Sequence, residues 1–128
     1  MEIISPDKVY IEPAVDIDNG AIIYPNNSLK GKSYISSEVI LKENNVIENS
    51  KIGKNSCISG SVIVDTAIGE NVYISAFCEI KNSLIGSDSL IEKGVSICNY
   101  HLPINSKVKP NEILGDNDDS DNRARKSR

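Results

Sequence analysis

The sequence is unusually poor in aromatic residues. Among 128 residues there is no Trp, one Phe and five Tyr, and there is also only one His. A domain of this length ordinarily fills its core with several large aromatic side chains, so this core has to be built from aliphatic residues. A zinc site with three histidine ligands would need three chains to meet on a symmetry axis, and we therefore expect no metal.

Net positive charge and long apolar segments are also lacking. The formal charge of −4 argues against a partner made of duplex nucleic acid. No apolar run approaches the roughly 18 residues of a membrane span, and residues 1–6 lack the basic and apolar regions of a signal peptide. The three cysteines are widely spaced, which fits neither a disulfide framework nor a metal knuckle. These absences predict a cytoplasmic protein without a membrane or nucleic-acid partner.

Isoleucine and asparagine dominate what is present. The chain has 20 Ile against 6 Leu, which favours strands, and 14 Asn, which favour frequent turns. Aliphatic residues recur at every fifth or sixth position, at Ile11, Ile17, Ile23, Leu29, Ile35, Leu41, Ile47, Ile52, Ile58, Ile63, Ile68, Ile74, Ile80, Ile85, Ile91 and Ile97. This is the hexapeptide signature of a parallel β-helix, in which three short strands make one coil of about 18 residues.

The positions between these rungs support the same fold. The residue two before each rung is small or Asn and shares its inward face, whereas Asn, Gly and Pro after the rungs suit the corners. Asn27 and Asn45 occupy the same inward slot, so we expect a side-chain amide ladder. Gly53, Gly69 and Gly86 should stack at one corner. The fold class is therefore all-β, a single β-helix of five full coils and the start of a sixth, with the period failing after Ile97.

The outward position before the rungs of one face is apolar or amphipathic in every coil. We call this surface the stripe, and its residues are Ile22, Ile40, Cys57, Tyr73 and Leu90. A continuous exposed stripe indicates an interface. The simplest assembly that would bury it is a homo-oligomer with cyclic symmetry. The domain boundaries predicted from these patterns are an N-terminal cap at 1–10, the β-helix at 11–115 and a disordered charged tail at 116–128.

Several segments resemble one bacterial enzyme family. These are residues 10–13 (Tyr-Ile-Glu-Pro), 22–26 (Ile-Ile-Tyr-Pro-Asn), 78–83 (Cys-Glu-Ile-Lys-Asn-Ser) and 97–100 (Ile-Cys-Asn-Tyr). They are similar to the β-helix domain of the bifunctional N-acetylglucosamine-1-phosphate uridyltransferase / glucosamine-1-phosphate acetyltransferase. The resemblance implies a left-handed helix, a homotrimer and acetyl transfer from acetyl-CoA. It also implies that Lys81 holds a sugar phosphate and that Asn99 and Tyr100 lie at the acetyl-CoA site.

The sequence departs from this family in several places. Lys93 stands where the family carries its catalytic histidine, His101 and Leu102 replace an Asp-Gly pair, and the uridyltransferase half has no counterpart. The segment 108–117 instead resembles the closing turn of small hexapeptide acetyltransferases. The chain is therefore interpreted as a shortened relative.

The single histidine, His101, is the candidate general base for acetyl transfer, because the attacking amine or hydroxyl has to lose a proton. Two hypotheses follow. The first is a homotrimeric acetyltransferase that acts on an amino sugar phosphate or a sugar nucleotide, with a reduced site of His101, Lys81, Asn99 and Tyr100. The second is a catalytically inactive trimeric scaffold or regulatory binding module derived from the same family.

Overall fold

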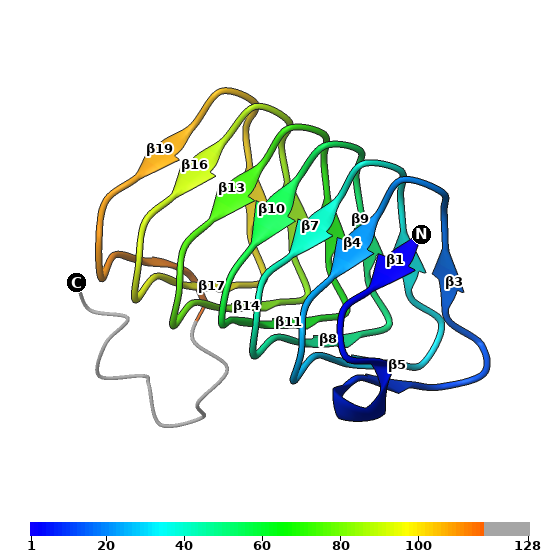
Figure 1. Cartoon of the computed structure of the whole chain (residues 1–128). Coiled ribbons are helices and arrows are strands. Elements are labelled where there is room, and N and C mark those ends of the chain that lie inside the picture. The colour runs from blue at the N-terminus through cyan, green and yellow to red at the C-terminus, as the bar shows by residue number, and fades with distance from the viewer. Residues whose placement is uncertain (117–128) are drawn as a thin grey trace.

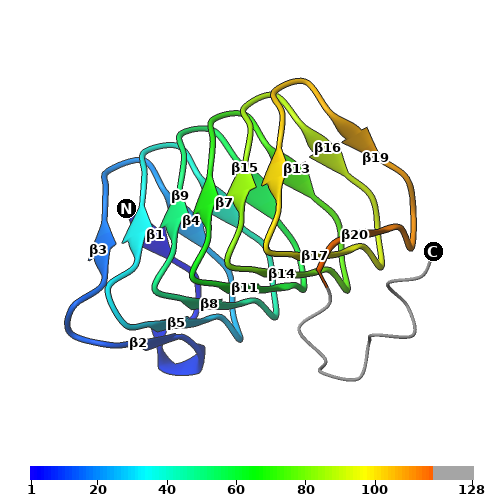
Figure 2. The same ribbon diagram turned by 180° about the vertical axis from the view of Figure 1, so that it is seen from behind.

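The chain forms a left-handed parallel β-helix of about seven turns (Figures 1 and 2). The computed structural model describes residues 1–116. Each coil contributes one short strand to each of three parallel sheets, and the chain turns at a corner between them. The strands of successive coils pair in parallel, so each sheet runs along the helix. The core lies between the three sheets.

We number the sheets I, II and III in the order in which the repeat visits them. Sheet I consists of β2 (Tyr10–Ile11), β5 (Ser28–Lys30), β8 (Val46–Glu48), β11 (Val62–Val64), β14 (Glu79–Lys81), β17 (Ser96–Cys98) and β20 (Ile113–Gly115). Sheet II consists of β3 (Asp16–Ile17), β6 (Tyr34–Ile35), β9 (Lys51–Ile52), β12 (Ala67–Ile68), β15 (Leu84–Ile85) and β18 (His101–Leu102). Sheet III consists of β1 (Glu2–Ile3), β4 (Ile22–Ile23), β7 (Ile40–Leu41), β10 (Cys57–Ile58), β13 (Tyr73–Ile74), β16 (Leu90–Ile91) and β19 (Lys107–Val108).

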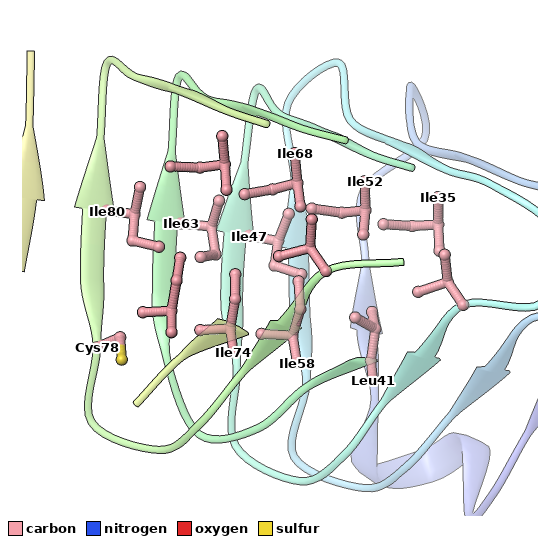
Figure 3. Packing of buried hydrophobic residues seen from close by; sticks show 14 of the residues in the cluster. Ile35, Leu41, Ile47, Ile52, Ile58, Ile63, Ile68, Ile74, Cys78 and Ile80 are labelled. Carbon is pink, nitrogen blue, oxygen red and sulfur yellow. The ribbon is translucent and has the colours of Figure 1, made fainter. Parts of the chain in front are cut away.

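The predicted rungs form the core. Ile47, Ile63 and Ile80 are partners in successive strands of sheet I, and all three are fully buried. Figure 3 shows the rungs of the three sheets stacked in columns. Burying one such side chain stabilises the fold by roughly 1.5–3 kcal/mol. The narrow space between the sheets explains why the core contains no aromatic rung.

Inward polar residues connect one coil to the next. At the corner between sheets I and II, Ser50 Oγ accepts a hydrogen bond from the backbone N–H of Thr66 at 3.1 Å, and Thr66 Oγ1 accepts one from Ser83 at 3.3 Å. The prediction of a hydrogen-bonded amide ladder is wrong. The side chains of Asn27 and Asn45 do not bond each other, because both Nδ2 groups donate to the backbone oxygen of Lys42, at 2.8 and 2.9 Å.

The predicted glycine stack is confirmed. A Cβ atom on Gly53 would lie 2.3 Å from the backbone oxygen of Gly69, and one on Gly86 would lie 2.4 Å from the nitrogen of Ile104. Side chains are therefore excluded at this corner by the approach of the next coil rather than by an unusual φ.

The prediction that the period fails after Ile97 is wrong. After Ile97 the period continues through Leu102 and Val108, both buried, to Leu114, and these residues pair with Ile85, Ile91 and Ile97. The helix is thus longer than the five to six coils that the sequence predicts.

The segment assigned to an N-terminal cap is partly built into the helix. β1 pairs with β4, and a short 3₁₀ helix, η1 (Pro6–Lys8), follows it. The backbone oxygen of Lys8 accepts a hydrogen bond from Asn26 N at 2.7 Å, which ties η1 to the next coil. The boundaries at 10 and 115 stay predictions, and the proposed tail lies outside the described residues from position 117 onward. Within residues 1–116, no helix has the length and apolar character of a membrane span.

Candidate functional site

The predicted site residues lie at or beside the corner between sheets I and II. The turns at this corner are short and similar in sequence, so they stack on one another. The turn after β14 consists of Asn82 with a left-handed φ of 48° and the buried Ser83, and the turn after β17 repeats it with Asn99 at φ 53° and Tyr100. Asn tolerates this backbone conformation better than most residues do. The two turns stack, and Asn82 Nδ2 donates to Asn99 Oδ1 at 2.6 Å.

The structure brings three of the predicted residues together and places the fourth one coil away. Asn99, Tyr100 and His101 follow one another around this corner, with His101 beginning β18. Lys81 ends β14 in the preceding coil and pairs with Cys98, so it lies beside the same corner. His101 pairs with Leu84 and is not in an irregular loop, in contrast to the expectation that it follows the end of the repeat.

Tyr100 is held by backbone contacts. Its N–H donates to Ser83 Oγ at 3.1 Å, and its carbonyl oxygen accepts from Leu84 N at 3.0 Å. The side chain packs against the core cluster in a slot that holds small residues in the other coils. The space for it comes from Gly115, where a Cβ atom would lie 2.9 Å from Tyr100 Cβ. Tyr100 therefore closes the core at this corner.

Lys81 forms an ion pair with Glu79, with Nζ 3.1 Å from Oε2, and the two side chains are 37% and 55% exposed. A surface pair of this kind stabilises by about 0–1 kcal/mol. Its energy is small enough for a bound anion to compete for the Lys81 ammonium group.

His101 projects from sheet II into solvent. Within the described residues, no hydrogen bond to its imidazole is formed by another side chain or by the backbone. A histidine base is ordinarily oriented by such a partner, so a substrate would have to supply the missing contact.

A shallow groove of about 420 Å³ runs along this corner and the adjoining face of sheet II. Its lining residues are Asn49, Lys51, Asp65, Thr66, Ala67, Asn82, Ser83 and Leu84. It leads to the predicted residues, since Leu84 is the strand partner of His101 and Asn82 is bonded to Asn99. Sequence reasoning missed the groove. The available signal was the small Ala67 between Lys51 and Leu84, its strand neighbours.

Two of the three cysteine thiols, those of Cys57 and Cys78, are poorly suited to nucleophilic catalysis. Burial raises the pKa of Cys57, although the nearby Lys42 opposes the effect, and burial also raises the pKa of Cys78. A raised pKa reduces the fraction of reactive thiolate. Within residues 1–116, no three His, Cys, Asp or Glu side chains gather in a way that could hold a metal ion.

Two other features lie away from this corner. Lys93 is exposed at the corner between sheets III and I, before Gly94. The stripe residues occupy the outer face of sheet III in continuous register, and Tyr73 is the most exposed of them.

Comparison with known proteins identifies the family by sequence. Residues 39–127, more than half of the chain, match the family described as "GlmU-like, C-terminal hexapeptide". The chain is 37% identical over 115 residues to the Bifunctional protein GlmU of Clostridium acetobutylicum and 35% identical to that of Clostridioides difficile (strain 630). Each match covers 89% of this chain but 25% of the relative. The chain thus spans about a quarter of the length of these curated relatives.

Solved structures share the fold at low identity. A mutant GDP-perosamine N-acetyltransferase from Caulobacter crescentus, in complex with CoA and GDP-perosamine, matches with a TM-score of 0.79 and 17% identity. The match covers 90% of this chain and 54% of that one. The UDP-N-acetylglucosamine acyltransferase of Francisella novicida matches with a TM-score of 0.51 and 17% identity, over 88% and 58% of the two chains.

Proposed function

The chain belongs to the GlmU-like C-terminal hexapeptide family, and from that membership we propose that it transfers an acetyl group from acetyl-CoA to an amino sugar. The acceptor is an amino sugar phosphate or a sugar nucleotide. The reaction takes place at the corner between sheets I and II. The protein acts as a homotrimer in the cytoplasm, with the stripe at the contacts between its chains.

The groove at this corner is the observation that carries the proposal. Its amides, at Asn49 and Asn82, and its carboxylate, at Asp65, are the groups that bind sugar hydroxyls by hydrogen bonds. Leu84 is 51% exposed and offers an apolar surface for the C–H face of a sugar ring. Lys51 lies in the same groove, and Lys81 lies beside it, so both ammonium groups are near a bound phosphate or diphosphate.

His101 acts as the general base in this proposal. The amino nitrogen of the sugar attacks the thioester carbonyl, the new C–N bond forms and the C–S bond breaks. His101 takes the proton that the amine loses and returns it to the departing CoA thiolate, so that CoA leaves as a thiol. Asn99 and Tyr100, which precede it at the corner, contact the acetyl-CoA.

One observation favours a second candidate function. The His101 imidazole is solvent-exposed and has no orienting hydrogen bond within the described residues. An unoriented histidine is a weak base for a defined reaction. If the groove binds a sugar nucleotide without turnover, the protein is a trimeric scaffold or regulatory binding module.

A turnover assay separates these two functions. Release of free CoA is measured with glucosamine 1-phosphate and with UDP-linked amino sugars, for the wild type, His101→Gln, Lys81→Gln and the control Lys54→Gln, whose side chain is exposed at another corner. We expect His101→Gln to lower kcat about 10²- to 10⁴-fold. Lys81→Gln should raise KM for the phosphorylated acceptor at nearly unchanged kcat, and Lys54→Gln should change neither. Sugar nucleotide binding without CoA release would instead establish the scaffold.

A further inference from the structure

Phe77 is the one phenylalanine of the chain, and its side chain is 80% exposed. It stands at the corner between sheets III and I with a φ of 66°. In the other coils the equivalent corner position holds Asn or Gly, at Asn26, Asn44, Gly60, Gly94 and Asn111. An aromatic residue with a left-handed φ is strained, and strain of this kind is retained where the residue has a function. Within the monomer, Phe77 contributes little core packing to offset it.

A hollow of about 620 Å³ lies beside Phe77, with Lys42, Glu43, Asn44, Ser59, Gly60, Tyr73 and Ala76 as its other lining residues. It is present because one corner is shorter than its neighbours. Five positions separate the rungs Ile58 and Ile63, whereas six separate Leu41 from Ile47 and Ile74 from Ile80. Gly60 occupies the shortened corner, and the nearest atom to a Cβ added there is Ala76 Cβ at 3.5 Å. A Cβ at position 60 would therefore make ordinary van der Waals contacts without a clash.

Two apolar surfaces converge on this corner. The stripe covers sheet III on one side. On the other side, Val46, Val62 and Val64 lie half-buried on the outer face of sheet I, where Val46 and Val62 are strand partners. The outer face of sheet II, opposite this corner, is mixed in character, with Asp16, Lys51 and His101 alternating with Tyr34, Ala67 and Leu84. The stripe and the three valines thus flank the III–I corner on its two sides.

We propose that the III–I corner faces the three-fold axis of the homotrimer and that Phe77 is its anchor. This inference rests on the trimer of the proposed function, whose axis would run parallel to the β-helix. Symmetry then brings the three copies of Phe77 to the same height, where their rings contact one another and fill the space left by the three shortened corners. Sheet III of each copy faces sheet I of the next, so the stripe meets the three valines.

Charges at the rim of the hollow are compatible with this arrangement. Lys42 and Glu43 both line it, so each copy brings one charge of each sign to the rim, and a cyclic trimer can pair opposite charges between neighbours. The groove at the I–II corner lies on the other side of the coil and stays open to solvent. The trimer contact and the sugar groove can therefore be altered separately.

The test is the oligomeric state by sedimentation velocity across a dilution series. The key variant is Phe77→Asn, because Asn suits the left-handed φ and should preserve the fold. A second variant, Gly60→Asn, places a side chain in the hollow and leaves residue 77 itself unchanged. The matched control is Ile104→Asn, since Ile104 is also exposed, at 65%, but lies at a different corner.

We expect the wild type and Ile104→Asn to sediment as trimers with the same dissociation behaviour. Phe77→Asn should raise the concentration for half-dissociation at least about 100-fold, as truncation of a central aromatic anchor does, while circular dichroism remains that of the wild type. Gly60→Asn should weaken the trimer in the same direction. A monomeric or dimeric wild type, or a Phe77→Asn trimer as stable as the wild type, would overturn the inference. The CoA-release assay tests the catalytic proposal independently, because the groove does not include this corner.

Discussion

Ser83 illustrates how a single buried hydroxyl joins two coils. Its Oγ donates to the backbone oxygen of Lys81 at 2.8 Å and accepts the N–H of Tyr100 at 3.1 Å. Ser83→Ala would leave that N–H without a partner in a partly buried position. Such a loss costs about 1–3 kcal/mol, and we expect a decrease of this size in the free energy of unfolding measured with urea.

Ser96 provides the control, since its side chain lies on the outer face of sheet I and is half-buried. Ser96→Ala should change the free energy of unfolding by no more than about 0.5 kcal/mol. Equal effects of the two substitutions would show that the hydroxyl ladder does not connect the coils energetically.

Glu12 makes the stability dependent on pH in the acid range. Its pKa is lowered, first because Gly31 N–H donates to Oε1 at 2.9 Å and second because the Tyr10 hydroxyl donates to Oε2 at 3.0 Å. A carboxylate with a depressed pKa in the folded state stabilises that state above the unfolded value. The contribution is lost as the pH falls through the folded pKa.

The measurement for Glu12 is the melting temperature of the wild type and of Glu12→Gln over a pH series. The wild type should melt at the higher temperature at neutral pH, and the difference should disappear in the acid range below the ordinary glutamate pKa of 4.5. A difference that stays constant with pH would mean that the ionised carboxylate is not responsible.

At the scale of the strand, alternation decides which substitutions the fold tolerates. In β12, Ile68 is 4% exposed and faces the core, whereas its neighbour Ala67 faces outward. Ile68→Asp places a charge without a partner in the middle of the ladder, and we expect it to abolish folding. Ala67→Asp, on the same strand, should remain folded. A soluble Ile68→Asp protein with an unchanged melting temperature would contradict the register.

Sequence reasoning predicts the strands well because inward positions recur with little variation. It fails after Ile97 for a physical reason. Tyr100 occupies an inner slot that is otherwise small, and Val108 takes the place of Ile or Leu, so the pattern is interrupted although the coil continues. Gly115 accommodates Tyr100 by its missing side chain. That compensation between residues 15 apart in sequence is visible only in three dimensions.

At the scale of the whole molecule, the sequence makes Asn99, Tyr100 and His101 neighbours in the chain, but it assigns them a common site with Lys81 only through a family resemblance. The small Ala67 is its one signal for the groove, which arises where the outer residues of β9, β12 and β15 stack. The hollow beside Phe77 likewise forms only where the III–I corners of three consecutive coils stack. These features arise only when the coils of the β-helix are stacked. The sequence repeat therefore predicts the fold but not the grooves and hollows on its surface.

The central claim is that this chain is an acetyl-CoA-dependent member of its family. Isothermal titration calorimetry with acetyl-CoA tests it most directly, with a parallel titration of UDP-N-acetylglucosamine. We predict saturable heat with acetyl-CoA and a stoichiometry of one molecule per chain, together with binding of the sugar nucleotide. No heat with either ligand would contradict the claim.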